Sequence, residues 1–215
     1  MTSNLPIAAT RVLATRPGPE DTLRAVAFAL LLAERTPVSG ADIASAAGVD
    51  DVGGALDALA GAGWLDRDTE GRVTGAAGLS LDHGEHVLMI AGHRFRTWCA
   101  YDALGIAGAL GADASIETSC GQCNVLIEVP VLAGRPPASR PARLWLSAGG
   151  TDLRTDFCTP TVLLCSMAHA ELWATEQHHQ GAILRLRPAA SRGAGEWAEC
   201  ARTAVALGAW VGPVR

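Results

Sequence analysis

Central to this sequence is the stretch Arg94-Phe95-Arg96-Thr97-Trp98-Cys99-Ala100-Tyr101-Asp102-Ala103-Leu104. It predicts the entry into an apolar helix that continues through Ile106 to Leu110. Cys99 and Asp102 are three residues apart, so on a helix a thiol and a carboxylate share one face. A thiolate is a soft nucleophile and metal ligand, and a carboxyl group beside it can carry a proton. A lone cysteine on an apolar helix is also commonly just a small buried residue, so both interpretations stay open here.

The composition is that of a packed globular protein. The 215 residues suffice for one sizeable domain or two small ones, and 49% of them are hydrophobic. No apolar run approaches the roughly 18 residues of a membrane span, and the N-terminus lacks the pattern of a secretory signal. The formal net charge of -5 argues against a nucleic-acid binder, which needs a basic surface. We therefore expect a cytoplasmic protein that binds neither nucleic acid nor membrane.

Periodicity divides the chain into three parts. Residues 1–21 predict a flexible arm, residues 22–80 a winged-helix-like unit, and residues 81–215 a second, larger domain. In the last part, strands alternate with scattered helices, which indicates a mixed or antiparallel sheet with flanking helices. The expected fold class is therefore α+β.

The winged-helix-like unit is predicted from three helices and a hairpin. The first helix should run from Asp21, its expected N-cap, to Arg35, and two short helices follow over residues 38–49 and 51–62. A polar hairpin of two short strands is expected between Gly63 and Gly75. The last of these helices is acidic, which favours a structural module over a DNA reader. Its region carries Asp50, Asp51 and Asp57.

The elements of the second domain, residues 81–215, are predicted from apolar segments separated by turns. The segment Ala148 to Pro160 is expected to be irregular. Helices are expected over residues 169–179 and from about Gly195 to Leu207. Strands are expected over residues 85–91, 114–119, 124–129, 142–147, 161–167 and 182–187.

The six cysteines carry most of the chemical information. In a cytoplasmic chain, cysteines are more often reduced, metal-ligating or catalytic than paired in disulfides. Cys120-Gly121-Gln122-Cys123 joins two predicted strands, and its spacing suits half of a zinc site. A second close pair is missing, so zinc stays an open alternative that Cys158, together with Cys165 or a histidine such as His169, would have to complete. Cys165 and Cys200 lie in apolar segments and are most simply core residues.

Four motifs in order and spacing resemble the organomercurial (alkylmercury) lyase family. They are Arg96-Thr97-Trp98-Cys99-Ala100-Tyr101-Asp102-Ala103-Leu104, Ser119-Cys120, Asp156-Phe157-Cys158, and Trp173 with His179-Gln180-Gly181. The resemblance covers the chain from about Thr22 to Glu196. Its specific part is the Trp-Cys-x-x-Asp helix together with the distant Phe-Cys. The N-terminal unit also resembles that family, where it does not read DNA.

The resemblance implies that residues 81–215 form an alkylmercury lyase-like catalytic domain. Its catalytic site would consist of Cys99, Asp102 and Cys158, which also hold the mercury of substrate and product. The family cleaves the carbon–mercury bond of R-Hg+ to give R-H and Hg(II), without an added cofactor. Two soft thiolates suit mercury, and Asp102 would take the thiol proton and deliver it to carbon. External cellular thiols would remove Hg(II). Mercuric reductase, beside which the family commonly works, is a candidate partner.

Some residues extend this site or depart from the family's pattern. We expect an apolar flank for the alkyl or aryl group, and ordinary core packing of the same side chains is an equally good interpretation. Cys120 matches a family cysteine that supports the fold, and Cys120 and Cys123 are additional thiols near the chemistry. Cys123 and Cys165 match no residue expected in the family, and Thr159 stands where some members have a further cysteine. The expected flank consists of Trp98, Tyr101, Leu104 and Ile106.

Two other functions remain open from the sequence. One is a non-catalytic cysteine-based metal-binding protein or metal sensor, for zinc or mercury, on the same fold. The other is a winged-helix regulator of metal resistance, which the acidic helix disfavours.

Overall fold

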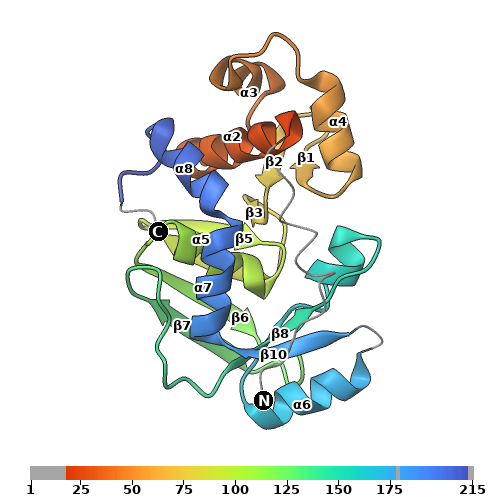
Figure 1. The fold of residues 1–215 in the computed structure, drawn as a ribbon, viewed down its shortest axis with the longest axis vertical. Helices are drawn as coiled ribbons and strands as arrows, with labels where there is room; N and C mark the ends of the chain where they lie inside the picture. Colours follow the sequence, from red (N-terminus) through yellow and green to blue (C-terminus); the bar gives the residue numbers. More distant parts are fainter. Residues whose placement is uncertain (1–17, 178–179, 213–215) are drawn as a thin grey trace.

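The computed structural model describes residues 18–177 and 180–212, so the predicted arm lies mostly outside the described residues. Three helices open the described chain (Figure 1): α2 (Pro19–Glu34), α3 (Gly40–Ala47) and α4 (Gly53–Gly61). The prediction of Asp21 as the N-cap of α2 was wrong. Gly18 is the N-cap, and Asp21 accepts a hydrogen bond from the Gly18 N–H at 3.1 Å. Pro19 explains the earlier start, because its fixed φ and missing N–H suit the first helical position.

A seven-stranded antiparallel sheet forms the centre of the molecule. The predicted hairpin exists as its first two strands, and it continues directly into the strands of the second half of the chain. One sheet therefore crosses the expected boundary at residue 80, and the division into domains stays a prediction. The strands, in spatial order, are β1 (Leu65–Arg67), β2 (Val73–Ala76), β3 (Leu79–Ser80), β5 (His93–Thr97), β4 (His86–Ile90), β6 (Ala114–Ser119) and β7 (Leu126–Val131).

A second, three-stranded antiparallel sheet lies at the opposite end from the N-terminal helices (Figure 1). Its order is β10 (Gly181–Arg185), β8 (Arg143–Ser147) and β9 (Leu163–Leu164). Helix α6 (Met167–Glu176) packs on it, and the end of the helix predicted to reach residue 179 lies outside the described residues. The predicted irregular segment was wrong in part, because a π-helical turn, η1 (Leu153–Cys158), forms within it.

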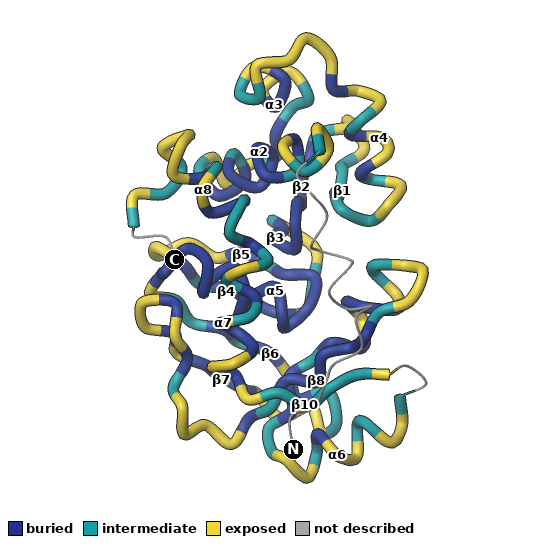
Figure 2. The backbone as a smooth tube through the Cα atoms, in the orientation of Figure 1, coloured by how far each residue is buried: buried dark blue, intermediate teal, exposed yellow. Residues whose placement is uncertain are grey.

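Helix α5 (Ala100–Ala109) is buried along its whole length between the large sheet and helix α7 (Leu186–Glu196), as Figure 2 shows by colour. The approach of α7 requires small residues, since a Cβ on Gly193 would lie 2.5 Å from the Gly105 Cα. The predictions need correction in two places. Residues 93–97 form β5 rather than the helix entry, and α7 was not predicted, whereas the helix expected from about Gly195 to Leu207 is confirmed as α8 (Ala198–Ala206).

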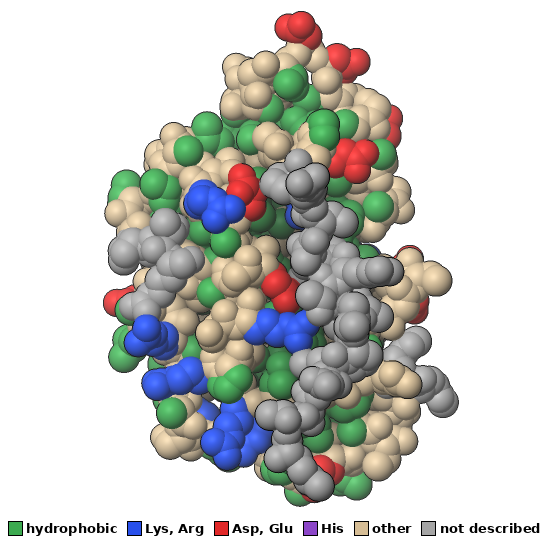
Figure 3. Space-filling model, viewed as in Figure 1, with side chains coloured by type: hydrophobic (Ala, Val, Ile, Leu, Met, Phe, Trp, Pro, Cys, Tyr) green, Lys and Arg blue, Asp and Glu red, His purple; other side chains and the backbone are tan. Residues whose placement is uncertain are grey.

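Charge is distributed unevenly over the surface. On the face in Figure 3, acidic side chains stand out on the N-terminal helices and arginines gather lower down. Asp50, Asp51 and Asp57 are exposed, and Asp57 pairs with Arg67 at 2.7 Å. Among the described helices, none has the length and apolarity needed to cross a bilayer.

Candidate active site

Cys99 occupies the N-cap of α5 and Asp102 its third helical position. The Cys99 N–H donates to Asp102 Oδ2 at 2.7 Å, and the Asp102 N–H faces the Cys99 sulfur. This reciprocal arrangement is a capping box, in which a thiol replaces the usual hydroxyl. The predicted proximity of thiol and carboxylate is therefore present, although Cys99 caps the helix instead of lying on its face.

Cys158 reaches the start of α5 from the π-helical turn η1. The Asp152 side chain caps this turn by accepting from two backbone N–H groups at 2.8 Å. Thr161 then joins the two elements, because its N–H donates to the Cys158 carbonyl at 3.0 Å and its carbonyl accepts from the Ala100 N–H at 3.3 Å. The Thr161 hydroxyl also accepts from the Ser147 N–H at 3.1 Å. Backbone pairing thus places Cys158 beside Cys99.

The ligand atoms of Cys99, Asp102 and Cys158 all lie within 4.8 Å of one another, and we call this group the buried cluster. The exposed fractions are 0% for Cys99, 3% for Asp102 and 4% for Cys158. All six cysteines of the chain are free thiols. The structure therefore brings together the three residues singled out from the sequence, in a site almost without access to water.

Burial dominates the protonation of this cluster. It raises the pKa of Asp102 to about 7, although the Cys99 N–H and the positive charge of Arg154 act in the opposite direction. It also raises the pKa of Cys99 well above its usual range, with hydrogen bonding to Cys158 and the nearby Asp102 charge adding to the effect. The N-terminus of a helix favours a thiolate, but here desolvation outweighs it. Near neutral pH the resting site holds a protonated Cys99 thiol and a carboxyl group ready to exchange a proton.

Tight packing holds the carboxyl group in place. Gly78 has a φ of +90°, and a Cβ there would lie 2.6 Å from the Asp102 Cγ. The Tyr101 ring meets Phe157 edge-on at 6.3 Å and Trp197 at 5.5 Å between centroids. These aromatic contacts connect α5 to η1 and α7, so the elements that carry the buried cluster share one packed layer.

A surface hollow of about 390 Å³ leads to Cys158. One wall is the Trp98 ring, over which the Arg154 guanidinium lies at 3.2 Å from the centroid. Asp66 fixes both, accepting from Trp98 Nε1 at 2.6 Å and from Arg154 Nη2 at 2.6 Å. Reasoning from the sequence missed Asp66 and Arg154, because nothing in their local pattern indicates that residues 88 positions apart meet at the mouth of the site.

Of the expected apolar flank, only Trp98 lines this hollow. Tyr101, Leu104 and Ile106 are fully buried in the core, as the alternative interpretation of core packing required. Their contact with a substrate group stays a prediction.

A second group of ligands, which we call the outer cluster, consists of Cys120, Cys123, Cys165 and His169. Its ligand atoms also lie within 4.8 Å of one another. The interpretation of Cys165 as a core residue was wrong, since it is partly exposed and belongs to this cluster. Cys158 belongs to the buried cluster, so the metal-binding set that joined it to Cys120 and Cys123 was also wrong. Cys200 is buried, as expected.

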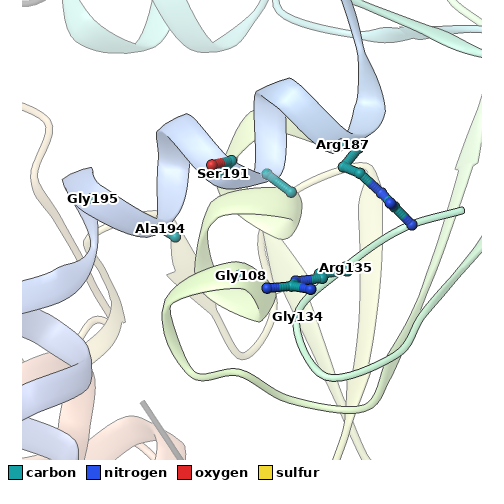
Figure 4. A pocket seen from close by; sticks show the side chains of 8 residues that line it. Gly108, Gly134, Arg135, Arg187, Ser191, Ala194 and Gly195 are labelled. Carbon is teal, nitrogen blue, oxygen red and sulfur yellow. The ribbon is translucent and has the colours of Figure 1, made fainter. Parts of the chain in front are cut away.

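A larger pocket of about 620 Å³ contains no thiol or carboxylate. It lies between α7 and the turn at Gly134, where Arg135 and Arg187 line it (Figure 4). Neither cluster borders this pocket, so its lining offers no thiol to bind mercury and no carboxyl group to deliver a proton.

Comparison with known proteins agrees with this geometry. A family model described as alkylmercury lyase matches residues 79–199, more than half of the chain. An alkylmercury lyase of Pseudomonas putida is 30% identical over 112 residues, covering 50% of this chain and 52% of the relative, so the match spans about half of that relative's length. An alkylmercury lyase of Bacillus cereus is 28% identical over 165 residues, covering 74% of this chain and 73% of the relative. The crystal structure of the mercury-bound form of MerB2 is similar in fold, with a TM-score of 0.76 at 21% identity, over 90% of this chain and 97% of that one.

Proposed function

The chain belongs to the alkylmercury lyase family, and from this premise we propose that it cleaves the carbon–mercury bond of R-Hg+ at the buried cluster. The products are the hydrocarbon R-H and Hg(II). The single observation that supports this assignment is a buried carboxyl group within 4.8 Å of two buried thiols. Two thiols alone can hold mercury, whereas bond cleavage also needs a proton delivered beside them.

Binding begins with exchange of the mercury ligands for sulfur. Mercury is soft, so thiolates outcompete oxygen donors, and two of them suit its nearly linear coordination. The Cys158 thiol loses its proton to the ligand that its sulfur displaces from mercury, and this ligand leaves in protonated form. The Cys99 thiol must also lose its proton as its sulfur–mercury bond forms. Asp102 is the nearest acceptor for that proton, since its carboxylate already bonds to the Cys99 N–H at 2.7 Å.

Cleavage returns that proton to carbon. When Cys99 and Cys158 both bind mercury, their electron donation makes the attached carbon more negative. The carbon–mercury bond breaks with its electron pair on carbon, and carbon takes the proton from Asp102 in the same step. A pKa of about 7 suits this exchange, because a general acid is most effective near the working pH. Hg(II) remains bound between the two sulfurs until external thiols remove it, and no added cofactor is required.

We propose that the substrate enters through the hollow walled by Trp98 and Arg154. Trp98 offers an apolar surface for the alkyl or aryl group, while the buried cluster beyond it excludes water from the reacting carbon. Small organomercurials are therefore the expected substrates.

Membership of the family also leads us to propose a role for the N-terminal unit, a cellular location and partners. The N-terminal unit, which we propose is a winged-helix relative, serves as a structural module, because its exposed Asp50, Asp51 and Asp57 would repel phosphate. We propose a role in mercury detoxification in the cytoplasm, with cellular thiols as acceptors of Hg(II) and mercuric reductase as a candidate partner.

The test is to incubate thiol-reduced protein with phenylmercury and to measure benzene and Hg(II). Wild type should release one benzene per phenylmercury consumed. Cys99→Ser should release none above the uncatalysed background, whereas Cys200→Ser, which changes a buried thiol outside both clusters, should keep the wild-type rate. Wild type that releases no benzene above background would show that the chain only binds metal. Equal release above background by wild type and Cys99→Ser would contradict the role of Cys99.

A further inference from the structure

The outer cluster takes no part in the proposed reaction, yet its four ligands converge from three separate elements. Cys120 and Cys123 lie in the turn between β6 and β7, Cys165 follows β9, and His169 lies in the first turn of α6. We propose that the outer cluster binds one zinc ion as a structural site, through three thiolates and one imidazole. Such a site would exist in addition to the catalytic one.

The spacing of the ligand atoms fits tetrahedral zinc. Zinc bonds of about 2.3 Å to sulfur and about 2.0 Å to nitrogen place two sulfurs about 3.8 Å apart, and a sulfur and a nitrogen about 3.5 Å apart. Cys123 Sγ lies 3.9 Å from Cys165 Sγ, and Cys120 Sγ lies 3.7 Å from His169 Nδ1. Cys165 Sγ and His169 Nδ1 are closer, at 3.1 Å. Zinc could therefore enter with only small side-chain movements.

The backbone around Cys120 prepares its sulfur to be a thiolate. The Cys120 N–H donates to the Val125 carbonyl at 2.8 Å, which folds the Cys-x-x-Cys segment into a tight turn. The Cys165 N–H points at Cys120 Sγ at 3.4 Å, and the N–H groups of Gln122 and Cys123 also face it. These donors surround the sulfur with positive hydrogen-bonding groups, an arrangement that suits the negative charge of a metal-bound thiolate.

The second pair of ligands is Cys165 and His169, four residues apart. The Ser166 hydroxyl caps α6 by accepting from the His169 N–H at 3.2 Å, which fixes the histidine at the start of the helix. The Gly121 N–H donates to the Leu163 carbonyl at 3.1 Å, so the turn and β9 are already joined beside the ligands.

The ligand set favours zinc in a structural role. Three sulfurs and one nitrogen complete a tetrahedral shell and leave no open position for a substrate, which distinguishes structural from catalytic zinc. A bound ion would fasten the β6–β7 turn, β9 and α6 together. Since β9 begins shortly after Cys158, the ion would also stabilise the segment that carries the catalytic thiol.

The experiment measures metal in the full-length protein purified from mercury-free, zinc-containing medium, by mass spectrometry of the metals. We expect close to one zinc per chain in wild type and less than a tenth of that in Cys123→Ser. His169→Ala should lose zinc, whereas His169→Cys, which restores a fourth ligand, should retain it. Cys200→Ala is the matched control and should keep the wild-type content.

A second readout does not depend on the variants folding well. Wild-type protein stripped with a chelator should take up one Co(II) per chain and show the visible absorption of tetrahedral cobalt with thiolate ligands, and zinc should then displace it. Its melting temperature should fall on stripping and recover with zinc. Wild type that contains no zinc as purified and takes up neither zinc nor cobalt after stripping would overturn the proposal, as would a different metal in the cluster or unchanged zinc content in Cys123→Ser.

Discussion

The buried cluster and the outer cluster both gather sulfur ligands within 4.8 Å, but they differ in what accompanies the sulfur. The buried cluster combines two thiols with a carboxyl group, and its residues are at most 4% exposed. The outer cluster combines three thiols with an imidazole, and its Cys123 is exposed. A complete set of four ligands suits a permanently bound ion. Two sulfurs leave mercury free to keep its carbon group, while the carboxyl group supplies the proton.

Burial raises the pKa in both places, but it prevails only at Asp102. Around Asp102 it keeps a proton on a carboxyl group near neutral pH, so the site can act as an acid. Around Cys120 the backbone donors overcome burial and favour a thiolate. Sulfur is therefore proposed to serve chemistry in one cluster and stability in the other, because the groups beside it differ.

The largest expected effect is that a variant of the buried cluster loses cleavage and a variant of the outer cluster loses zinc. Cys158→Ser should reduce benzene release from phenylmercury at least about 10³-fold, because it removes a mercury ligand, and should leave zinc content unchanged. Cys123→Ser should lose zinc and keep benzene release within about threefold of wild type. Measuring benzene release and zinc content in both variants tests whether the two clusters are independent. If each variant lost both properties, the two clusters would act as one metal site.

The next largest effect concerns the proton donor. Asp102→Asn keeps the hydrogen bond to the Cys99 N–H but cannot donate a carboxylic proton, so benzene release should fall about 10²- to 10⁴-fold. Mercury bound per chain, measured after removal of free metal, should stay at the wild-type value.

The pH dependence of cleavage tests the same role of Asp102. Once mercury is bound and Asp102 holds the proton from Cys99, only this protonated form can deliver it. Single-turnover cleavage measured from the mercury-bound complex should therefore be level at low pH and fall as pH rises above the pKa of Asp102, which is about 7 in the free site. The descending limb should disappear in Asp102→Asn. Undiminished cleavage by that variant at every pH would assign the proton to another group.

The buried cluster could be anticipated from the sequence because its parts are local or distinctive. Cys99 and Asp102 are three residues apart, and the resemblance supplied Cys158, which the structure places in contact range. The helical spacing of α2 and the strand Ala114–Ser119 were also correct in outline. The prediction failed at residues 93–97, which pair with β4 in a tight hairpin. Its turn consists of Ala91 and Gly92, both at positive φ, and the sequence was interpreted there as the introduction to a helix.

The outer cluster was only half visible from the sequence. The Cys-x-x-Cys turn was recognised, and Cys165 and a histidine such as His169 were named as alternative completing ligands. The sequence did not show that both complete the set in place of Cys158, because Cys165 lies in an apolar segment and was assigned most simply to the core. A Cys-x-x-x-His spacing at the start of a helix was the available signal. The ion pair of Asp66 with Arg154 had no such signal, as it depends on the docking of η1 against β1.

A smaller effect should follow from the backbone beside the acid. Gly78→Ala places a Cβ 2.6 Å from the Asp102 Cγ and should displace the carboxyl group, lowering benzene release about tenfold or more. Gly71→Ala is the matched control, because Gly71 has a φ of +78° but nothing within 4 Å of an added Cβ. Both variants carry the same backbone strain, so a similar loss of activity in the two would show that strain, and not the position of Asp102, is responsible.

The smallest effect tests the charge at the mouth of the site. The positive charge of Arg154 lowers the pKa of Asp102, so Arg154→Met should raise that pKa further. The descending limb of single-turnover cleavage should then move to higher pH by a fraction of a unit, whereas changes in substrate entry would alter the rate at all pH values alike. Arg67→Met removes an equal charge that pairs with the exposed Asp57, and should leave the limb in place. A limb that moves to lower pH in Arg154→Met would contradict Asp102 as the titrating acid, because losing a nearby positive charge can only make its carboxylate harder to form.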